Sequence, residues 1–237
     1  MRSASLMTQL LCCLGLICIF NGCHPERTVA AADTTGTIRY GDNGVPIAVK
    51  GSDLSAPYDA DPEFQILKVE KRYADIAFYY LDRMRATFKL TSAHDEFLVT
   101  DIQIDTLGQK HIRLEQIFNT IPVWGKDLRV HLNKKNQVYY VHGVYQPIAA
   151  DLKTRAEISR EAAAEKALRS MPDPDQWHVV KIDTCIWAPD NALQRLSYKV
   201  KMASKLDSQA CFVDAIDGNV FHCISETMTL TPKSNKK

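Results

Sequence analysis

Hydrophobic residues recur at helical spacing through the segment QILKVEKRYADIAFYYLDRMRATFKL. They form one stripe, which consists of Ile66, Val69, Tyr73, Ile76, Tyr80, Met84 and Phe88. Positions three and four residues apart lie on one side of an α-helix, so the stripe predicts a long helix with one face in the core. Asp61-Pro62-Glu63 predicts where it begins, because aspartate caps a helix and proline suits the first helical position.

After residue 96 the hydrophobic period changes to two, which is typical of half-buried β-strands. The segment KHIRLEQIF places Ile112, Leu114 and Phe118 on one side of a strand. Gln116 is the polar exception on that side. DLRVHL repeats the alternation, and QVYYVHGVY predicts a third strand after the turn NKKN. Upstream, TIRYGDNGVPIAVKG predicts a hairpin. A long helix followed by an antiparallel sheet with one apolar face indicates an α+β layer.

The same order of elements appears a second time further along the chain. ISREAAAEKALRSM predicts a helix that begins after the capping residue Ser159 and ends before Pro172. Four runs that predict strands follow: WHVVKIDTCIW, LQRLSYKVKM, QACFVDA and NVFHCISETMTL. We therefore expect an α+β protein of two consecutive helix-on-antiparallel-sheet units, residues 37–148 and 149–229, with a disordered tail over residues 230–237.

The N-terminal residues predict an export signal and not a part of the fold. An apolar run over residues 10–20 follows Arg2; it is too short for a membrane-spanning helix of about 20 residues and suits a signal-peptide core. The run ends in FNGC, which resembles a bacterial lipoprotein box with Cys23 as the lipidated residue. We expect a signal peptide over residues 1–22 and a tether over residues 23–36. Cleavage after Ala32 is the alternative, and export holds in either case.

Composition and charge narrow the class of function. The chain is 46% hydrophobic and 24% charged, as expected of a soluble globular protein. Arg2 is one of 29 basic residues and the only charge in the first 23 residues. Beyond residue 23 the remaining 28 basic residues therefore balance the 28 acidic residues. No basic block or arginine stripe indicates a nucleic-acid partner.

Three cysteines follow the signal and the tether: Cys185, Cys211 and Cys223. In an oxidising compartment an odd number allows one bridge and leaves one thiol over. Asp217-Gly218 predicts a hairpin turn, and a three-residue loop over residues 216–218 sets Cys211 opposite Cys223. We predict a disulfide between those two; three buried free cysteines are the alternative.

The central segment DTLGQKHIRLEQIFNTIPVWGKDLRVHLNKKNQVYYVHGVY, residues 105–145, resembles the FTP domain of fungalysin and thermolysin propeptides. The family pattern runs D-x-x-G-x-x-H-x-R, then an aromatic-containing strand, then G-[IV]-P-V-[FW]-G and V-H-[LV]. Thr120 departs from it, since the family most often has glycine there. The matching residues are Asp105, Gly108, His111, Arg113, Pro122, Val123, Trp124, Gly125, Val130 and His131.

Residues 156–229 resemble the PepSY domain that follows the FTP domain in the same precursors. The whole likeness covers about residues 36–229 and implies two cystatin-like units, FTP-like over 37–148 and PepSY-like over 149–229. It also implies a propeptide-like protein that binds a thermolysin-like metallopeptidase in trans, as an inhibitor or a folding chaperone. With the export signal, we expect this protein in the cell envelope, attached to the membrane through lipid on Cys23.

The expected interaction surface combines polar positions of the sheet with the PVWG corner. His111 and Arg113 alternate with apolar residues on one strand, as do Arg129 and His131 on the next. Trp124 offers a large apolar ring in a segment whose proline and glycine suit a bend. Trp124 therefore fits either a structural corner or a contact with a partner.

The sequence offers little catalytic chemistry. A thermolysin-like catalytic domain needs H-E-x-x-H, two histidines one helical turn apart with a glutamate as general base, and the chain has none. AHDEF, residues 93–97, holds one histidine and predicts a loop. His111, His131 and Glu115 suit zinc in type, but neighbouring arginines disfavour a cation, so we expect a hydrogen-bond network instead. We predict no enzymatic activity, no metal and no cofactor.

Two further hypotheses follow from the same features. The chain could be an extracytoplasmic module that binds peptides or a small ligand, since one fold serves many functions. It could also be a remnant of a precursor that has lost its peptidase.

Overall fold

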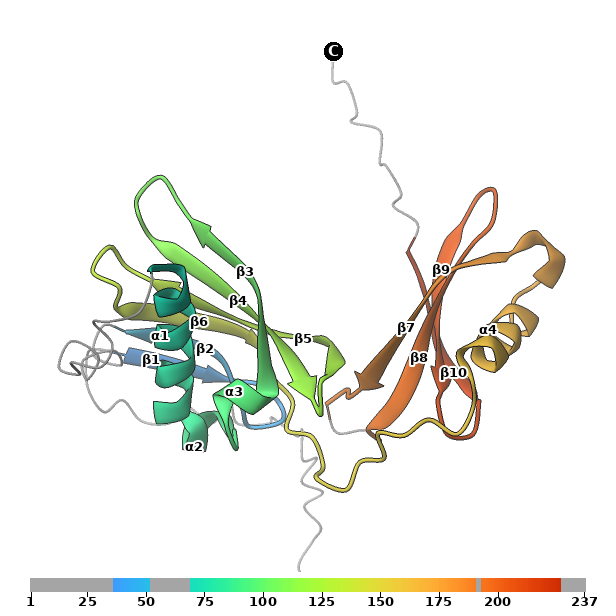
Figure 1. Ribbon diagram of the computed structural model, residues 1–237, viewed down its shortest axis with the longest axis horizontal. Coiled ribbons are helices and arrows are strands. Elements are labelled where there is room, and N and C mark those ends of the chain that lie inside the picture. The colour runs from blue at the N-terminus through green and yellow to red at the C-terminus, as the bar shows by residue number, and fades with distance from the viewer. Residues whose placement is uncertain (1–35, 52–68, 191–192, 227–237) are drawn as a thin grey trace, which may run out of the picture. The chain divides into compact units, whose positions relative to one another are not determined.

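A computed structural model describes residues 36–51, 69–190 and 193–226 of the chain (Figure 1). Within these residues the fold is α+β, mostly sheet with few helices. None of the described helices is long and apolar enough to cross a membrane. The predicted signal peptide, Cys23, the helix start at Asp61 and the C-terminal tail all lie outside the described residues.

The first group of strands forms an antiparallel sheet in the order β1-β2-β6-β5-β4-β3. β1 and β2 form the hairpin that the sequence predicts, β4 and β5 follow the predicted alternation, and β6 is the predicted third strand. The strands are β1 (Gly36–Tyr40), β2 (Pro46–Gly51), β3 (Phe97–Ile104), β4 (Lys110–Phe118), β5 (Ile121–Leu132) and β6 (Val138–Val144).

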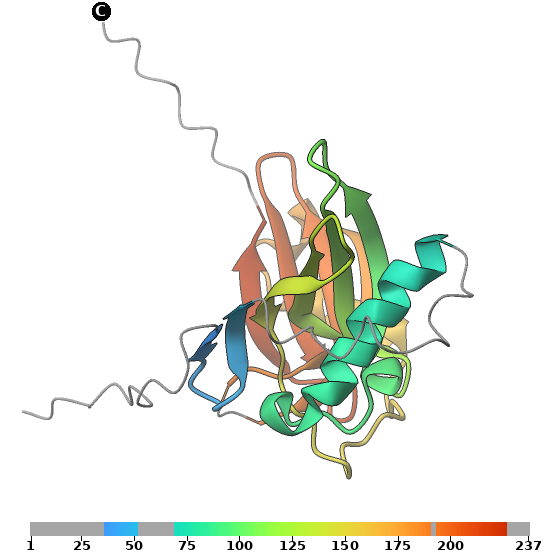
Figure 2. The same ribbon diagram turned by 90° about the vertical axis from the view of Figure 1, so that its left-hand side faces the viewer.

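Helix α1 (Val69–Arg83) lies across one face of this sheet (Figure 1, Figure 2). Tyr73, Ile76 and Tyr80 of the predicted stripe are buried against the strands. The inward positions alternate along β4 and the second half of β5, as the sequence predicts. In β6 a register irregularity sets both Val138 and Val141 inward. These core residues include Ile112, Leu114, Leu128, Val130, Leu132, Val138 and Val141.

The helix ends earlier than the sequence predicts. The apolar stripe predicts one helix through Phe88, but α1 ends at Arg83 and a short helix α2 (Arg85–Phe88) follows. The backbone departs from helical geometry at Met84, with φ −93° and ψ 9°. After this break Phe88 lies in the core with 1% of its surface exposed. Burial of Phe88 therefore explains the stripe without a continuous helix.

The segment AHDEF is a short helix and not the predicted loop. Helix α3 (Ala93–Glu96) is capped by Ser92, whose side-chain oxygen accepts the N–H of Asp95 at 3.4 Å. Such a cap satisfies a backbone donor that the first helical turn leaves free. β3 begins directly after it, at Phe97.

The polar exception on the apolar side of β4 is a buried glutamine with its hydrogen bonds satisfied. Gln116 is 1% exposed. Its side-chain nitrogen donates to the carbonyl of Gln146 at 2.6 Å, and its side-chain oxygen accepts the N–H of Gln146 at 3.0 Å. Buried polar groups are tolerated when they are paired in this way. The two hydrogen bonds of Gln116 therefore connect the segment after β6 to β4.

The second group of strands follows a helix. Helix α4 (Arg160–Arg169) begins after Ser159, whose hydroxyl accepts the N–H of Ala162 at 3.1 Å, as the sequence predicts. A 3₁₀ turn, η4 (Pro174–Gln176), leads to the sheet. The antiparallel neighbours are, in order, β7 (His178–Trp187), β8 (Arg195–Ala203), β9 (Ser208–Asp214) and β10 (Val220–Ser225).

Helix α4 covers one face of these strands (Figure 1). Ala163 and Ala167 of the helix are fully buried, and small side chains at these two positions let the helix approach the sheet closely. They pack with apolar residues of β8 and β9, which are Leu196, Tyr198, Val200, Met202, Cys211 and Val213.

The PVWG segment joins the two groups of strands. Between Pro122 and Asp127, β5 runs out of register with β4. Val123 in this stretch instead forms a parallel bridge with Ile186 of β7. Both residues are fully buried, together with Ala188. The division into two cystatin-like units, at residues 148 and 149, remains a prediction.

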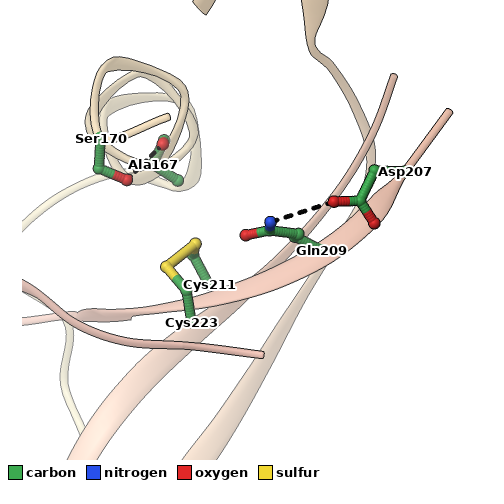
Figure 3. Close-up of a disulfide and its surroundings, with 6 residues drawn as sticks. All are labelled: Ala167, Ser170, Asp207, Gln209, Cys211 and Cys223. Atoms are coloured by element: carbon green, nitrogen blue, oxygen red, sulfur yellow. Dashed lines mark hydrogen bonds between the residues drawn. A yellow bond between two sulfur atoms is a disulfide. The ribbon is translucent and has the colours of Figure 1, made fainter. Parts of the chain in front are cut away.

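Cys211 of β9 and Cys223 of β10 form a disulfide (Figure 3). The two residues face each other in the strand register. Cys211 is fully buried beneath α4, whereas Cys223 on the edge strand is exposed. Cys185 is a buried free thiol, and burial raises its pKa to about 12.

The hairpin turn before β10 differs from the predicted three-residue loop. The N–H of Asp214 donates to Asn219, and Val213 pairs with Val220, so the turn covers residues 215–218. The side chain of Asp214 accepts the N–H of Ile216 at 2.8 Å, which stabilises this wider turn. A bulge between Val220 and His222 then restores the register in which the two cysteines meet.

Reduction of the disulfide should lower the free energy of unfolding by about 2 kcal/mol, because the bridge limits the freedom of the unfolded chain. Urea unfolding with and without a phosphine reductant measures this. Cys185→Ala is the matched control and should show the same response to the reductant, since Cys185 takes no part in the bridge. Identical unfolding midpoints for the oxidised and reduced chain would contradict the prediction.

Candidate functional site

One face of the first sheet carries most of the residues that the sequence predicts for interaction. His111 and Arg113 of β4 pair directly with His131 and Arg129 of β5. The residues that alternate with them are buried toward α1, so these four side chains point to the opposite face. His142 of β6 joins them, because it pairs with Arg129. We call these five residues the histidine face.

The three histidines of this face contact one another across β4, β5 and β6. The Nδ1 atoms of His111 and His131 lie 2.6 Å apart. The ring of His131 stacks on that of His142, with centroids 5.0 Å apart, and Tyr140 packs on both rings. Nε2 of His131 is buried and has no hydrogen-bond partner among the described residues.

Asp105 determines which nitrogen of His111 carries a proton. Its Oδ2 lies 3.3 Å from Nε2 of His111, and a carboxylate accepts, so Nε2 donates. The N–H of Gln109 holds the pKa of Asp105 below its ordinary value, with further contributions from His111 and Leu107. In neutral His111 the bare Nδ1 then accepts the Nδ1–H of His131.

Burial lowers the pKa of His131 from its ordinary 6.5 to about 4, and the neighbouring His111, His142 and Arg129 act in the same direction. Burial and Arg129 also lower the pKa of His142, with Asp127 opposing them. Both rings are therefore neutral at pH 7. Arg113 and Arg129 supply positive charge to this face.

Acid should destabilise the folded chain through His131. Between pH 6.5 and about 4 the unfolded chain binds a proton that folded His131 does not bind, so stability falls across this window as the pH is lowered. We expect a loss on the order of 1–2 kcal/mol, reduced by solvent screening of the half-buried ring. Urea unfolding at pH 7, 5.5 and 4 measures it.

Two variants separate His131 from other groups that titrate in acid. His131→Gln should show a shallower loss of stability over that window than the wild-type chain. His178→Gln changes an exposed histidine at the start of β7 and should follow the wild type. If His131→Gln loses as much stability as the wild type, the assignment to His131 is wrong.

The two arginines of the histidine face are exposed. Nε of Arg113 donates to Oδ2 of Asp127 at 2.6 Å, and the Arg113 side chain is 52% exposed. An ion pair this exposed contributes at most about 1 kcal/mol to stability, but it holds the guanidinium in one orientation. Arg129 lies beside it on β5, so the face presents two cations next to the neutral rings of His131 and His142.

The arrangement of these side chains suits hydrogen bonding. Within the described ranges, no group of three or more His, Cys, Asp and Glu side chains is placed to hold a metal ion. The Nδ1 atoms of His111 and His131 face each other directly. Glu115, the third ligand considered from the sequence, pairs in the strand register with Asp127.

Trp124 lies apart from the histidines, at the junction of β5 and β7. Its ring stacks on Trp187 with centroids 5.1 Å apart and an interplanar angle of 12°. It also meets the buried ring of Phe212 edge-on at 4.8 Å. Next to it, Nζ of Lys126 pairs with Oδ1 of Asp190 at 3.0 Å. In the structure Trp124 thus belongs to an aromatic cluster that connects the two groups of strands.

Sequence reasoning missed two parts of this arrangement. His142 takes an outward position of the strand QVYYVHGVY, so the same alternation that selected His131 could have found it. The aromatic partners of Trp124 had no such signal. Trp187 and Phe212 lie far along the chain, and only the β5–β7 bridge brings them to Trp124.

Comparison with known proteins places this face in a recognised motif. Residues 95–145 match the family model described as Fungalysin/Thermolysin Propeptide Motif. The chain is similar to thermolysin of Alicyclobacillus acidocaldarius subsp. acidocaldarius, with 27% identity over 171 residues, which is 66% of this chain and 31% of that protein. It is also similar to bacillolysin of Bacillus cereus, with 26% identity over 100 residues, or 41% and 17% of the two chains.

The chain therefore spans about a third of the length of the thermolysins that it matches. Among solved structures it is similar to the Bacillus megaterium YpeB C-terminal domain, with a TM-score of 0.34, 12% identity, and 76% of this chain and 71% of that chain covered. At that TM-score the likeness carries no argument about the fold. The sequence matches indicate a propeptide-like protein, and the matched motif is a non-catalytic region of thermolysin-type precursors. The likeness of residues 156–229 to PepSY remains a prediction.

Proposed function

We propose that this chain binds a thermolysin-like metallopeptidase and acts on it as an inhibitor or as a folding chaperone. The propeptide-motif match over residues 95–145, inside a longer region similar to thermolysin, is the observation that supports this most. The proposal takes the peptidase to be a separate polypeptide, which this chain binds in trans.

The histidine face is the proposed contact surface for the peptidase. All five of its residues fall within the matched motif. The exposed Arg113 and Arg129 are of the residue type that often dominates the energy of an interface, and the ion pair to Asp127 already orients Arg113. A specific complex of ordinary size would bury about 1,600 Å² in total, which extends beyond these five residues across the sheet.

The proposal also places the chain outside the cytoplasm. In this proposal the export signal directs the chain across the membrane, and a lipid on Cys23 attaches it to the membrane. Mass spectrometry of the mature N-terminus separates the two routes of processing. An acylated Cys23 supports the anchor, whereas a free N-terminus at Asp33 supports cleavage after Ala32 and a chain without the anchor.

Binding to a catalytically inactive thermolysin variant, measured by titration calorimetry, tests the proposal. We expect saturable binding with a Kd of about 1 μM or tighter, or about −8 kcal/mol. Arg129→Glu should weaken it about tenfold or more. Lys205→Glu makes the same charge change at an exposed turn between β8 and β9 and should bind as the wild type does. Absence of binding by the folded wild-type chain would contradict the proposal.

A further inference from the structure

A groove of about 750 Å³ lies where the segment after β6 passes the start of β8 and the end of β9. This volume is in the range of sites that hold peptides and small ligands, about 300–1,000 Å³. Leu193, one of its lining residues, is 70% exposed and open to a ligand. The larger apolar side chains that line it are Pro147, Ile148, Leu152, Leu193, Leu196 and Ile216.

Hydrogen bonds hold the two walls of the groove in place. The side-chain oxygen of Gln194 accepts the N–H of Ala149 at 2.9 Å, and its nitrogen donates to the carbonyl of Pro147 at 2.8 Å. Ile148 and Leu152 pack against the buried residues of the β5–β7 junction. A groove whose walls are already ordered costs a ligand less to bind.

The charges in the groove leave an acidic rim. Arg195 pairs with the buried Asp214, Nη1 to Oδ2 at 3.3 Å, so these two charges offset each other. Lys153 pairs with Glu157 at 3.5 Å. Asp151 and Asp217 are both exposed, and neither takes part in an ion pair within the described chain. Lys166 lies over Gly218 but does not line the groove.

We propose that this groove binds an extended, cationic apolar peptide. An apolar side chain of the peptide lies against Leu152 and Leu193, and a basic side chain lies against Asp151 and Asp217. An acidic peptide would instead meet two like charges, which disfavours it. This inference goes beyond the proposed function, because the groove lies outside the matched propeptide motif. Peptide binding is measured without a peptidase, so either proposal can fail while the other stands.

Three labelled peptides test the proposal by fluorescence anisotropy with the full chain. The probe is Gly-Lys-Leu-Leu-Lys-Gly, with Gly-Glu-Leu-Leu-Glu-Gly as the charge control and Gly-Lys-Ser-Ser-Lys-Gly as the apolar control. We expect saturable binding of the probe and about tenfold or weaker binding of each control peptide. No saturation of the probe up to about 1 mM, or equal binding of the acidic peptide, would overturn the proposal.

Variants with matched controls locate the binding on the chain. Asp151→Lys and Leu193→Ser should each weaken probe binding about tenfold. Two control variants make the same changes outside the groove: Asp175→Lys in η4 and Leu206→Ser between β8 and β9. The Leu206 side chain is 92% exposed, and Asp175 is also exposed. Both controls should bind the probe as the wild type does. Wild-type affinity in Asp151→Lys and Leu193→Ser, with folding checked by circular dichroism, would remove the groove as the site.

Discussion

Gly143→Ala should lower the free energy of unfolding by about 4 kcal/mol or more. Gly143 lies in β6 opposite Leu128 of β5, with φ at 139°. A Cβ there would come within 2.1 Å of the carbonyl oxygen of Asp127 and 2.9 Å of Cα of Leu128. Because both atoms belong to the backbone of β5, the contact is relieved only if the two strands separate. Urea unfolding at pH 7 measures the loss.

Gly125→Ala is the matched control for this substitution. Gly125 also has a positive φ, 70°, but a Cβ there would meet nothing within 4 Å. The substitution should cost only the strain of a left-handed backbone, about 1–2 kcal/mol. Equal stability of the Gly143→Ala and Gly125→Ala chains would mean that β5 and β6 do not approach each other as closely as described.

Trp124→Ala should lower the free energy of unfolding by about 3 kcal/mol. The substitution removes a ring that stacks on Trp187 and covers the fully buried Phe212, so apolar burial is lost and a cavity forms. Urea unfolding gives the loss, and the near-ultraviolet circular dichroism of the stacked tryptophans should fall with it. Unchanged stability would show that Trp124 contributes nothing to the junction.

Trp124→Phe distinguishes the two roles that the sequence leaves open for this residue. Phenylalanine keeps an aromatic ring against Trp187, so we expect a loss of only about 1 kcal/mol. If Trp124 is a structural corner, this variant should bind the peptidase as the wild type does. Loss of peptidase binding at nearly unchanged stability would instead assign Trp124 to the contact with the partner.

Local pattern predicted most of the elements in this fold. The alternation around Ile112, Leu114 and Val130 gave both the strands and their buried face, because each side chain in a strand points opposite to its neighbours. Ser159 could also be interpreted locally, as a cap whose hydroxyl accepts the N–H of Ala162. Such features depend on residues close together in the sequence or on one strand pair.

Features that depend on distant contacts could not be predicted. The helix break at Met84 preserves the apolar stripe, so periodicity alone does not reveal it. The bridge between Val123 and Ile186 joins strands that are far apart along the chain and leaves no local pattern. The pairing of Cys211 with Cys223 was predicted, but the wider turn and the bulge after Val220 that produce it were not.

The same distinction holds for the histidine face. The outward positions of His111 and His131 follow from alternation. Their direct pairing depends on the irregularity between Pro122 and Asp127, which shifts the register set by the turn. The contact between the two Nδ1 atoms, the stacking of His142 and the role of Asp105 in placing the proton depend on side-chain geometry. Burial, with smaller contributions from His111, His142 and Arg129, lowers the pKa of His131 in this arrangement, and sequence alone provides no reason to expect it.

The most direct test of the central claim is to titrate thermolysin with this chain and record peptidase activity on a fixed peptide substrate. One series starts from native peptidase and the other from denatured peptidase diluted into refolding buffer. The account predicts saturable inhibition of the native enzyme, or a saturable rise in recovered activity, at about 1 μM or below. Flat titrations in both series, with the chain shown to be folded, would contradict it.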